Sequence, residues 1–177
     1  NEIVDLAKKL TGEALYTSDI SLPDMLCGKI MRSPHPHARI LSVDITKADA
    51  QFPDVAILTP FNVQEGHVAP DIPILDTKVR FVGDEVVAIA AINEFEVSRA
   101  LSLVNVKYDI LPFSLNTDEA MSVDAEPIHQ GGNLVNGAPI VEQRGDISEG
   151  FEQADLIVER SFSTPGHSSA SLEPRCV

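Results

Sequence analysis

The chain has 177 residues, 44% of them hydrophobic, which is enough to bury a core as one full domain or two small ones. Its formal net charge of −14 argues against nucleic acid and against an anionic membrane surface, because both carry phosphates that would repel it. Two cysteines far apart, no glycosylation sequon, no visible signal peptide and no apolar run long enough to span a bilayer lead us to expect the cytoplasm.

The first sixty residues are expected to form strands and one short helix. Strands are predicted at residues 25–32, 38–45 and 55–59. In the second of these strands, the alternation assigns Leu41, Val43 and Ile45 to the buried face. A short helix over residues 47–51 would be N-capped by Thr46, because its hydroxyl suits that position.

The clearest unit is a strand, a helix and a strand between residues 79 and 111. Residues 79–92 read as two strands, or as a bent one, broken at Gly83-Asp84-Glu85, where we expect a hairpin-like bend with solvated acids. A helix is predicted over residues 94–103, with an apolar face made of Phe95, Ala100, Leu101, Leu103 and Val104. A strand follows over residues 104–111, whereas residues 64–78 contain glycine and proline and are predicted to be a loop.

The chain reads differently after a loop-rich stretch at residues 122–139, and we place a domain boundary there. Asp146 is expected to N-cap a helix over residues 147–154, with Glu149 in its first turn. The Arg-Gly-Asp sequence that Asp146 completes is therefore read as a turn and not as an integrin motif. Residues 155–164 alternate strongly and predict a strand.

Two histidines, His35 and His37, flank a proline and would share one face of an extended chain. A stable zinc site needs three or four ligands at short range, and the remaining histidines and cysteines form no close ligand pair. We therefore expect a kinked entry into a strand here and no metal site. The Gly-Gly-Asn sequence at residues 131–133 is likewise expected to be a turn and not a phosphate cradle, because no P-loop lysine accompanies it.

Five phrases, in order, resemble the molybdenum-cofactor subunit of the xanthine dehydrogenase and aldehyde oxidase family. They are TGEALYTSDISLPDMLCGKI, RSPHPHARI, VRFVGDEVVAIAA, VNVKYDILP and RGDISEGFEQADLIVERSFSTPGHSSASLEPR, and together they span about residues 10–175. The resemblance implies an α+β fold, an α/β-hammerhead with mixed sheets and a few short helices. It places the hammerhead domain, with an N-terminal segment, at residues 1–135. Residues 136–177 would begin the molybdopterin-binding domain with its first strand.

The resemblance also implies a chemistry, the hydroxylation of aldehydes or heteroaromatic carbons with oxygen taken from water. In that family a molybdopterin-type cofactor and a general-base glutamate carry out the reaction, and electrons pass through iron–sulfur clusters to FAD. The pterin loops and that glutamate follow Val177 in family members, and this chain begins with Asn1 and not Met. We therefore expect a scaffold fragment that is inactive alone and that has no catalytic, cofactor-binding or metal-binding residue. Its expected partners are the remainder of the subunit and the iron–sulfur and flavin subunits or domains.

Three residues near the expected cofactor domain are weak candidates for a functional role, His167, Glu173 and Arg175. Glu173 and Arg175 would share a face of an extended chain, so they could form an ion pair. That pair is expected to support the structure, with support of a substrate channel as the alternative.

A second hypothesis is a standalone binding or carrier module with a barrel-sandwich-like hammerhead. A carrier needs a modifiable lysine at a hairpin tip, whereas Lys29, Lys47, Lys78 and Lys107 all fall in or beside predicted elements. A third is an assembly domain that binds only partner subunits.

Overall fold

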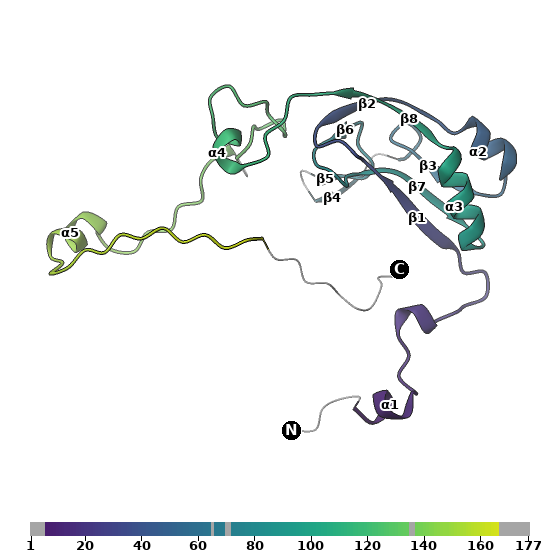
Figure 1. The fold of residues 1–177 in the computed structure, drawn as a ribbon, viewed down its shortest axis with the longest axis horizontal. Coiled ribbons are helices and arrows are strands. Elements are labelled where there is room, and N and C mark those ends of the chain that lie inside the picture. Colours follow the sequence, from purple (N-terminus) through teal and green to yellow (C-terminus); the bar gives the residue numbers. More distant parts are fainter. Residues whose placement is uncertain (1–5, 65, 70–71, 135–136, 167–177) are drawn as a thin grey trace. The chain divides into compact units, whose positions relative to one another are not determined.

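The computed structural model describes residues 6–64, 66–69, 72–134 and 137–166 (Figure 1). Contacts within the chain divide it into two units, Asp24–Ile140 and a second one made of Asn1–Pro23 with Val141–Val177. Each unit is considered by itself.

The unit Asp24–Ile140 contains two three-stranded sheets and a small hairpin. Sheet A has the order β1-β7-β3, with β1 at Cys27–Arg32, β7 at Glu85–Ala91 and β3 at Ala56–Leu58. Sheet B has the order β6-β2-β8, with β6 at Lys78–Val79, β2 at Ala38–Asp44 and β8 at Asn105–Ile110. The hairpin pairs β4 at His67–Ala69 with β5 at Ile72–Pro73, inside the region predicted to be a loop. All these pairings are antiparallel among the described strands.

Short helices complete this unit, and the α+β class is confirmed. They are α2 at Thr46–Gln51, α3 at Glu94–Leu103 and α4 at Thr117–Ala120. α3 packs against β1 and β7, and α2 packs against α3. β7 and β8 flank α3 in the sequence but belong to different sheets, so α3 links sheet A to sheet B and does not cross over within one sheet.

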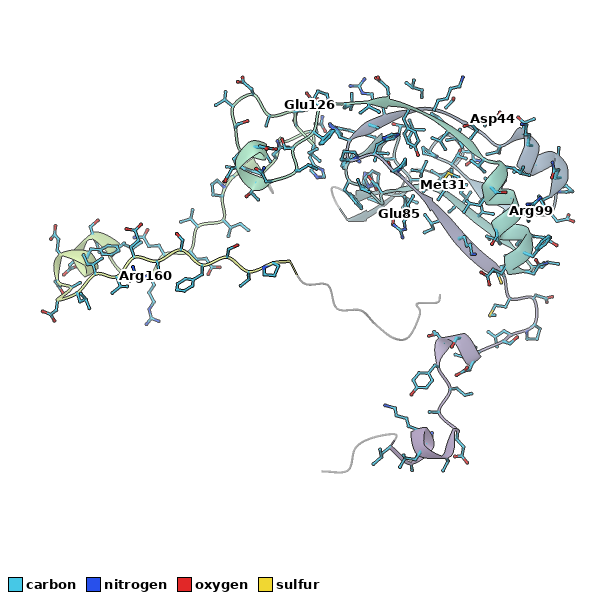
Figure 2. The ribbon with its side chains drawn as sticks, viewed as in Figure 1. Met31, Asp44, Glu85, Arg99, Glu126 and Arg160 are labelled. Atoms are coloured by element: carbon cyan, nitrogen blue, oxygen red, sulfur yellow. The ribbon has the colours of Figure 1, made fainter. Side chains whose placement is uncertain are left out.

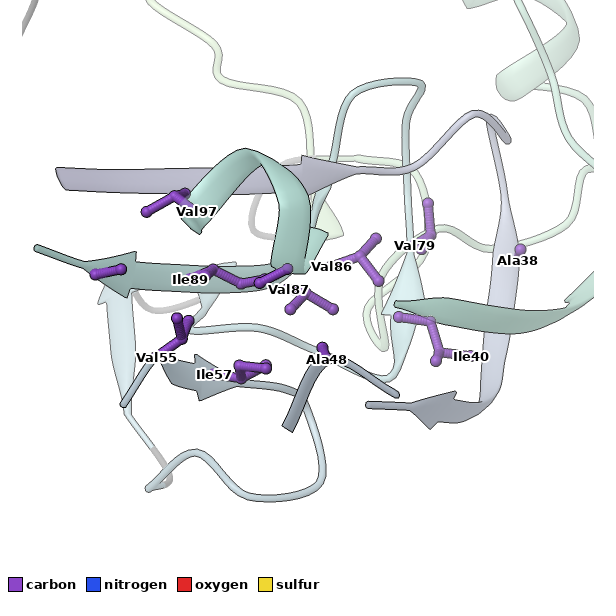
Figure 3. Packing of buried hydrophobic residues seen from close by; sticks show 12 residues of the cluster. Ala38, Ile40, Ala48, Val55, Ile57, Val79, Val86, Val87, Ile89 and Val97 are labelled. Carbon is purple, nitrogen blue, oxygen red and sulfur yellow. The ribbon is translucent and has the colours of Figure 1, made fainter. Parts of the chain in front are cut away.

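The core lies between sheet A, the two packed helices and sheet B. Its buried residues are Ala38, Ile40, Ala48, Val55, Ile57, Val79, Val86, Val87, Ile89, Ala91, Val97 and Ala100 (Figure 3). On α3, Val97 and Ala100 are fully buried, whereas Phe95 is 70% exposed. The assignment of Phe95 to the apolar face is wrong, because two residues turn an α-helix by about 200° and place Phe95 opposite Val97.

The buried face of β2 changes along the strand. Ile40 is 4% exposed and Leu41 is 61% exposed, the reverse of the predicted assignment. The register with β8 shifts between Ile40 and Ser42, which is the signature of a β-bulge. Because the extra residue reverses the alternation, Val43 and Ile45 beyond it are partly buried against the core, as predicted.

Of the two N-caps predicted from the sequence, one is present in the structure. The N-cap predicted for Thr46 is wrong, because α2 begins at Thr46 with Ile45 in the cap position and no side-chain cap bond. The Thr46 N–H donates to Asp44 Oδ1 at 3.0 Å. That hydrogen bond lowers the pKa of Asp44. In the other unit, the cap predicted for Asp146 is confirmed, since its Oδ1 accepts from the Glu149 N–H at 3.1 Å at the start of α5 (Ile147–Glu152).

The second unit contains α1 at Leu6–Thr11, a 3₁₀ turn at Thr17–Asp19 and α5. The strand expected at residues 155–164 is not formed, because these residues pair with no strand in the described chain and all are exposed. Figure 2 shows the Arg160 side chain extending away from this segment. Of the helices described, none is long and apolar enough to cross a membrane.

The bulge in β2 predicts unequal costs for truncating two adjacent residues. Ile40→Ala should lower the free energy of unfolding by about 2–4 kcal/mol, because it opens a cavity in the core. Leu41→Ala, the matched control, should cost about 0.5 kcal/mol or less, because Leu41 faces solvent. Urea unfolding of the two variants measures both values. A larger loss for Leu41→Ala would favour the face assignment that simple alternation predicts.

Candidate functional site

The three candidates nearest the expected cofactor domain, His167, Glu173 and Arg175, lie outside the described residues. Their roles stay predictions. The polar groups that the structure brings together belong to another region, which joins the two sheets.

Residues 32–37, from the last residue of β1 in sheet A to the residue before β2 in sheet B, are called the junction. Its backbone is bonded to the turn before β7: the Ser33 N–H donates to the Asp84 carbonyl, and the Gly83 N–H donates to the Ser33 carbonyl, both at 2.8 Å. Gly83 has φ +99°, a conformation that favours glycine. Arg32 Nη1 donates to the Gly83 carbonyl and to Glu85 Oε1, both at 2.7 Å. Hydrogen bonds to the turn before β7 therefore hold the junction against sheet A.

The junction is hydrogen-bonded to sheet B through His37, which is completely buried. His37 Nδ1 lies 2.6 Å from the Pro112 carbonyl, just past β8, and the Leu111 N–H donates to the His37 carbonyl at 3.0 Å. Because a carbonyl can only accept, Nδ1 is the nitrogen that carries the proton. Nε2 is buried with no hydrogen-bond partner among the described residues.

The two histidines of the junction have different environments. Residues 34–37 form bends and are not extended. The condition under which the His35 and His37 rings would share one face is therefore not met. The His35 ring makes an edge contact with Tyr108, with centroids 4.9 Å apart at 72°. Burial raises the pKa of Tyr108. Within the described part of the chain, no three His, Cys, Asp or Glu residues gather as metal ligands.

The acids at the turn before β7 are less solvated than predicted. Asp84 is partly buried, with Oδ2 accepting from the Arg80 N–H at 2.8 Å and Oδ1 from the Glu85 N–H at 3.1 Å. Burial raises the pKa of Asp84 above its ordinary value of 3.8, although both hydrogen bonds oppose the shift. The predicted bend is present, but the prediction of solvated acids is wrong for Asp84, since its carboxylate is used to close the turn.

A cavity of about 350 Å³ opens beside this turn. It is lined by Pro73, Leu75, Asp76, Arg80, Phe81, Asp84, Glu85 and His129. Arg80 Nη2 pairs with Asp76 Oδ2 at 2.6 Å. Burial raises the pKa of Asp76, but the hydrogen bond and charge of Arg80 outweigh it and leave that pKa below 3.8. The charges of Asp76 and Arg80 therefore neutralise each other in the cavity wall.

Lys78 holds the chain beside the cavity, a role that the sequence pattern did not predict. Its Nζ donates to the Pro127 and Ile128 carbonyls, each at 2.9 Å, which places His129 at the cavity wall. Burial is the main cause of the lowered pKa of Lys78. No sequence signal indicates this bond, because Lys78 and residues 127–128 lie far apart in the chain.

The predicted turn at residues 131–133 is present, and the backbone amide of its central residue and the Asn133 side chain are bonded within the chain. The Gly132 N–H donates to the His129 carbonyl at 3.0 Å, and the Ile128 N–H donates to Asn133 Oδ1 at 2.8 Å.

The junction predicts unequal roles for its two histidines. His37→Ala should lower the free energy of unfolding by about 2–4 kcal/mol, because it removes a buried ring and the bond to Pro112. The matched control, His35→Ala, should cost about 0.5–1.5 kcal/mol, since it loses mainly the contact with Tyr108. Urea unfolding measures both losses. Equal losses, or ¹⁵N shifts that put the neutral His37 proton on Nε2, would contradict this assignment.

The two aspartates of the cavity are expected to titrate on opposite sides of pH 3.8. The lowered pKa of Asp76 stabilises the fold above pH 3.8, and this stabilisation is lost as pH falls through the folded pKa. The raised pKa of Asp84 has the opposite sign, so stability falls as pH rises from 3.8 through its folded pKa. A ¹³C NMR titration of the carboxyl carbons measures both pKa values. Asp84 titrating below 3.8 would refute the burial argument.

Arg80→Gln tests the cause of the Asp76 shift in the same titration. The pKa of Asp76 should rise toward 3.8, because its main cationic partner is lost. Arg32→Gln removes the neighbouring pair with Glu85 and is the matched control, which should leave the pKa of Asp76 unchanged.

Comparisons with known proteins identify the fold that carries this junction. The family model for aldehyde oxidase and xanthine dehydrogenase, a/b hammerhead domain, matches residues 11–112. A probable xanthine dehydrogenase subunit of Bacillus subtilis is 36% identical over 93% of this chain and 23% of its own length. The nicotinate dehydrogenase large molybdopterin subunit of Eubacterium barkeri is 34% identical over 97% of this chain and 41% of its own length. The chain thus spans less than half of either relative.

Solved structures agree with the family match. A reconstituted CO dehydrogenase from Oligotropha carboxidovorans is 36% identical, with a TM-score of 0.61 over 71% of this chain and 16% of that one. The chain therefore belongs to the aldehyde oxidase and xanthine dehydrogenase family, with its a/b hammerhead domain at residues 11–112.

Proposed function

We propose that the chain is the hammerhead scaffold of a molybdenum-cofactor subunit whose complete enzyme hydroxylates an aldehyde or heteroaromatic carbon with oxygen from water. One observation supports the scaffold role. Polar residues in the sequence motifs that resemble the family form hydrogen bonds to other parts of this chain. Arg32 and Ser33 bind the turn before β7, and His37 binds Pro112. The side chains of Arg32 and His37 and the backbone of Ser33 are therefore engaged within the chain.

The rest of the enzyme carries the reaction in this proposal. We assign the molybdopterin cofactor, its binding loops and the catalytic glutamate to the remainder of the subunit, and iron–sulfur clusters and FAD to partner subunits or domains. Residues 136–177 begin the molybdopterin-binding domain in this proposal. Its candidate residues stay His167, Glu173 and Arg175, and a structural ion pair between Glu173 and Arg175 stays a prediction. The complete enzyme is expected in the cytoplasm.

The carrier alternative is less well supported by the positions of the lysines. All six lie within helices or strands: Lys8 and Lys9 in α1, Lys29 in β1, Lys47 in α2, Lys78 in β6 and Lys107 in β8. Two of them are also bonded, Lys29 to Glu94 and Lys78 to backbone carbonyls. A carrier lysine must instead project from a turn.

The proposal is tested by comparing the 177-residue chain with the complete subunit in its enzyme complex. The complex should contain bound molybdenum and should transfer ¹⁸O from labelled water into an aldehyde or heteroaromatic substrate from a panel. The 177-residue chain should do neither, because the proposed reacting groups lie elsewhere. Elemental analysis and mass spectrometry measure both properties. Stoichiometric molybdenum on the 177-residue chain, or ¹⁸O transfer by it, would refute the scaffold role.

A further inference from the structure

Sheet A presents one face to the helices and an opposite face that is largely uncovered. Lys29 on β1 faces α3, since its Nζ donates to Glu94 at 2.8 Å and to Ser98 at 2.9 Å. Neighbouring positions of a strand point the other way. The strand registers align two rows on that opposite face, Gly28–Ala90–Ala56 and Ile30–Ala88–Leu58. These six residues, all uncharged and apolar, are called the open face.

The open face is exposed where its side chains are largest. Ile30 is 44% exposed and Leu58 is 46% exposed, and no residue of the open face belongs to the core. The apolar surface continues past the strand ends, where Leu26 before β1 is 58% exposed and Ile92 after β7 is 72% exposed. An antiparallel sheet with one solvated face normally alternates apolar and polar residues, whereas residues 86–92 are uninterrupted apolar sequence. That pattern is typical of a strand buried on both faces.

Gly28 shows that space is left on this face. A Cβ added at Gly28 would meet only the Ile89 carbonyl, at 3.7 Å, which is ordinary van der Waals contact. The packing within this chain therefore does not require a glycine there. Glycine inside a strand often marks a place where another backbone approaches closely. With Ala90 and Ala56 beside it, Gly28 forms a shallow row suited to receive large side chains from outside.

We propose that the open face is the docking surface for another part of the same molybdenum-cofactor subunit, outside these 177 residues. This inference rests on the proposed function. The length of the relatives favours it, because the chain spans 23% of the Bacillus subtilis protein and 41% of the Eubacterium barkeri protein. Most of such a subunit is therefore available to cover sheet A.

The size of the open face also favours an occupant in the same polypeptide. Strands of six, seven and three residues, about 4.8 Å apart, give roughly 250 Å². Independent proteins need about 800 Å² on each side for a stable interface. A segment joined covalently needs less, because its effective concentration is high. A second copy of the chain or a separate subunit would have to add contacts elsewhere.

Hydrogen exchange tests the proposal without any substitution. The amides of β1, β3 and β7 are measured by mass spectrometry in the 177-residue chain and in the complete subunit purified without its partners. We expect at least about tenfold slower exchange in the complete subunit, because burial suppresses local opening. Equal exchange in both would overturn the proposal. Slowing that appears only after partner subunits are added, or only in a dimer of the 177-residue chain, would overturn it in favour of those occupants.

Substitutions give a second, independent test. Gly28→Val and Ala90→Glu should leave the melting temperature of the 177-residue chain unchanged or higher, because the open face is solvated there. In the complete subunit both should sharply reduce the folded, soluble fraction. Ser42→Glu, an exposed change on sheet B, is the control and should be tolerated in both. Equal effects in both proteins would contradict the docking surface, whereas failure of molybdenum binding with normal docking would refute only the proposed function.

Discussion

The junction at residues 32–37 is the constraint on which the two-sheet arrangement depends. At one end, Ser33 exchanges backbone hydrogen bonds with the turn before β7, which belongs to sheet A. At the other end, the buried His37 ring bonds the Pro112 carbonyl beyond β8, which belongs to sheet B. One short bend thus fixes two sheets that share no strand. The bond to Pro112 also explains why a polar residue, His37, is buried beside apolar strands.

Several strands were predictable because their sequences alternate with a period of two or, in β7, form a short apolar run. β1, β7 and β8, and the helix α3, lie where the patterns put them. The wrong predictions concern side chains whose burial depends on parts of the chain that are distant in sequence. The bulge that exposes Leu41 exists only against β8, and the same kind of side chain is buried at position 37 and packed on Tyr108 at position 35.

The candidate site was less predictable than the fold, for a related reason. Nothing in the local sequence indicates that Lys78 reaches the carbonyls of residues 127 and 128, or that Asp84 closes a turn with both oxygens. Such bonds join residues that are far apart or depend on a turn's detailed geometry. The family motifs identified the segments that contact one another, but they did not indicate which hydrogen bonds each residue makes. The segments at residues 32–40, 79–91 and 104–112 contact one another, and this agrees with the proposed scaffold role.

The central claim is that the junction makes sheets A and B one cooperative unit. Native-state hydrogen exchange in increasing urea measures the free energy of opening for each sheet separately. The account predicts that the slowest amides of β7 and β2 report the same free energy and merge into one unfolding transition. A lower and separate opening free energy for sheet B, with sheet A still protected, would contradict it.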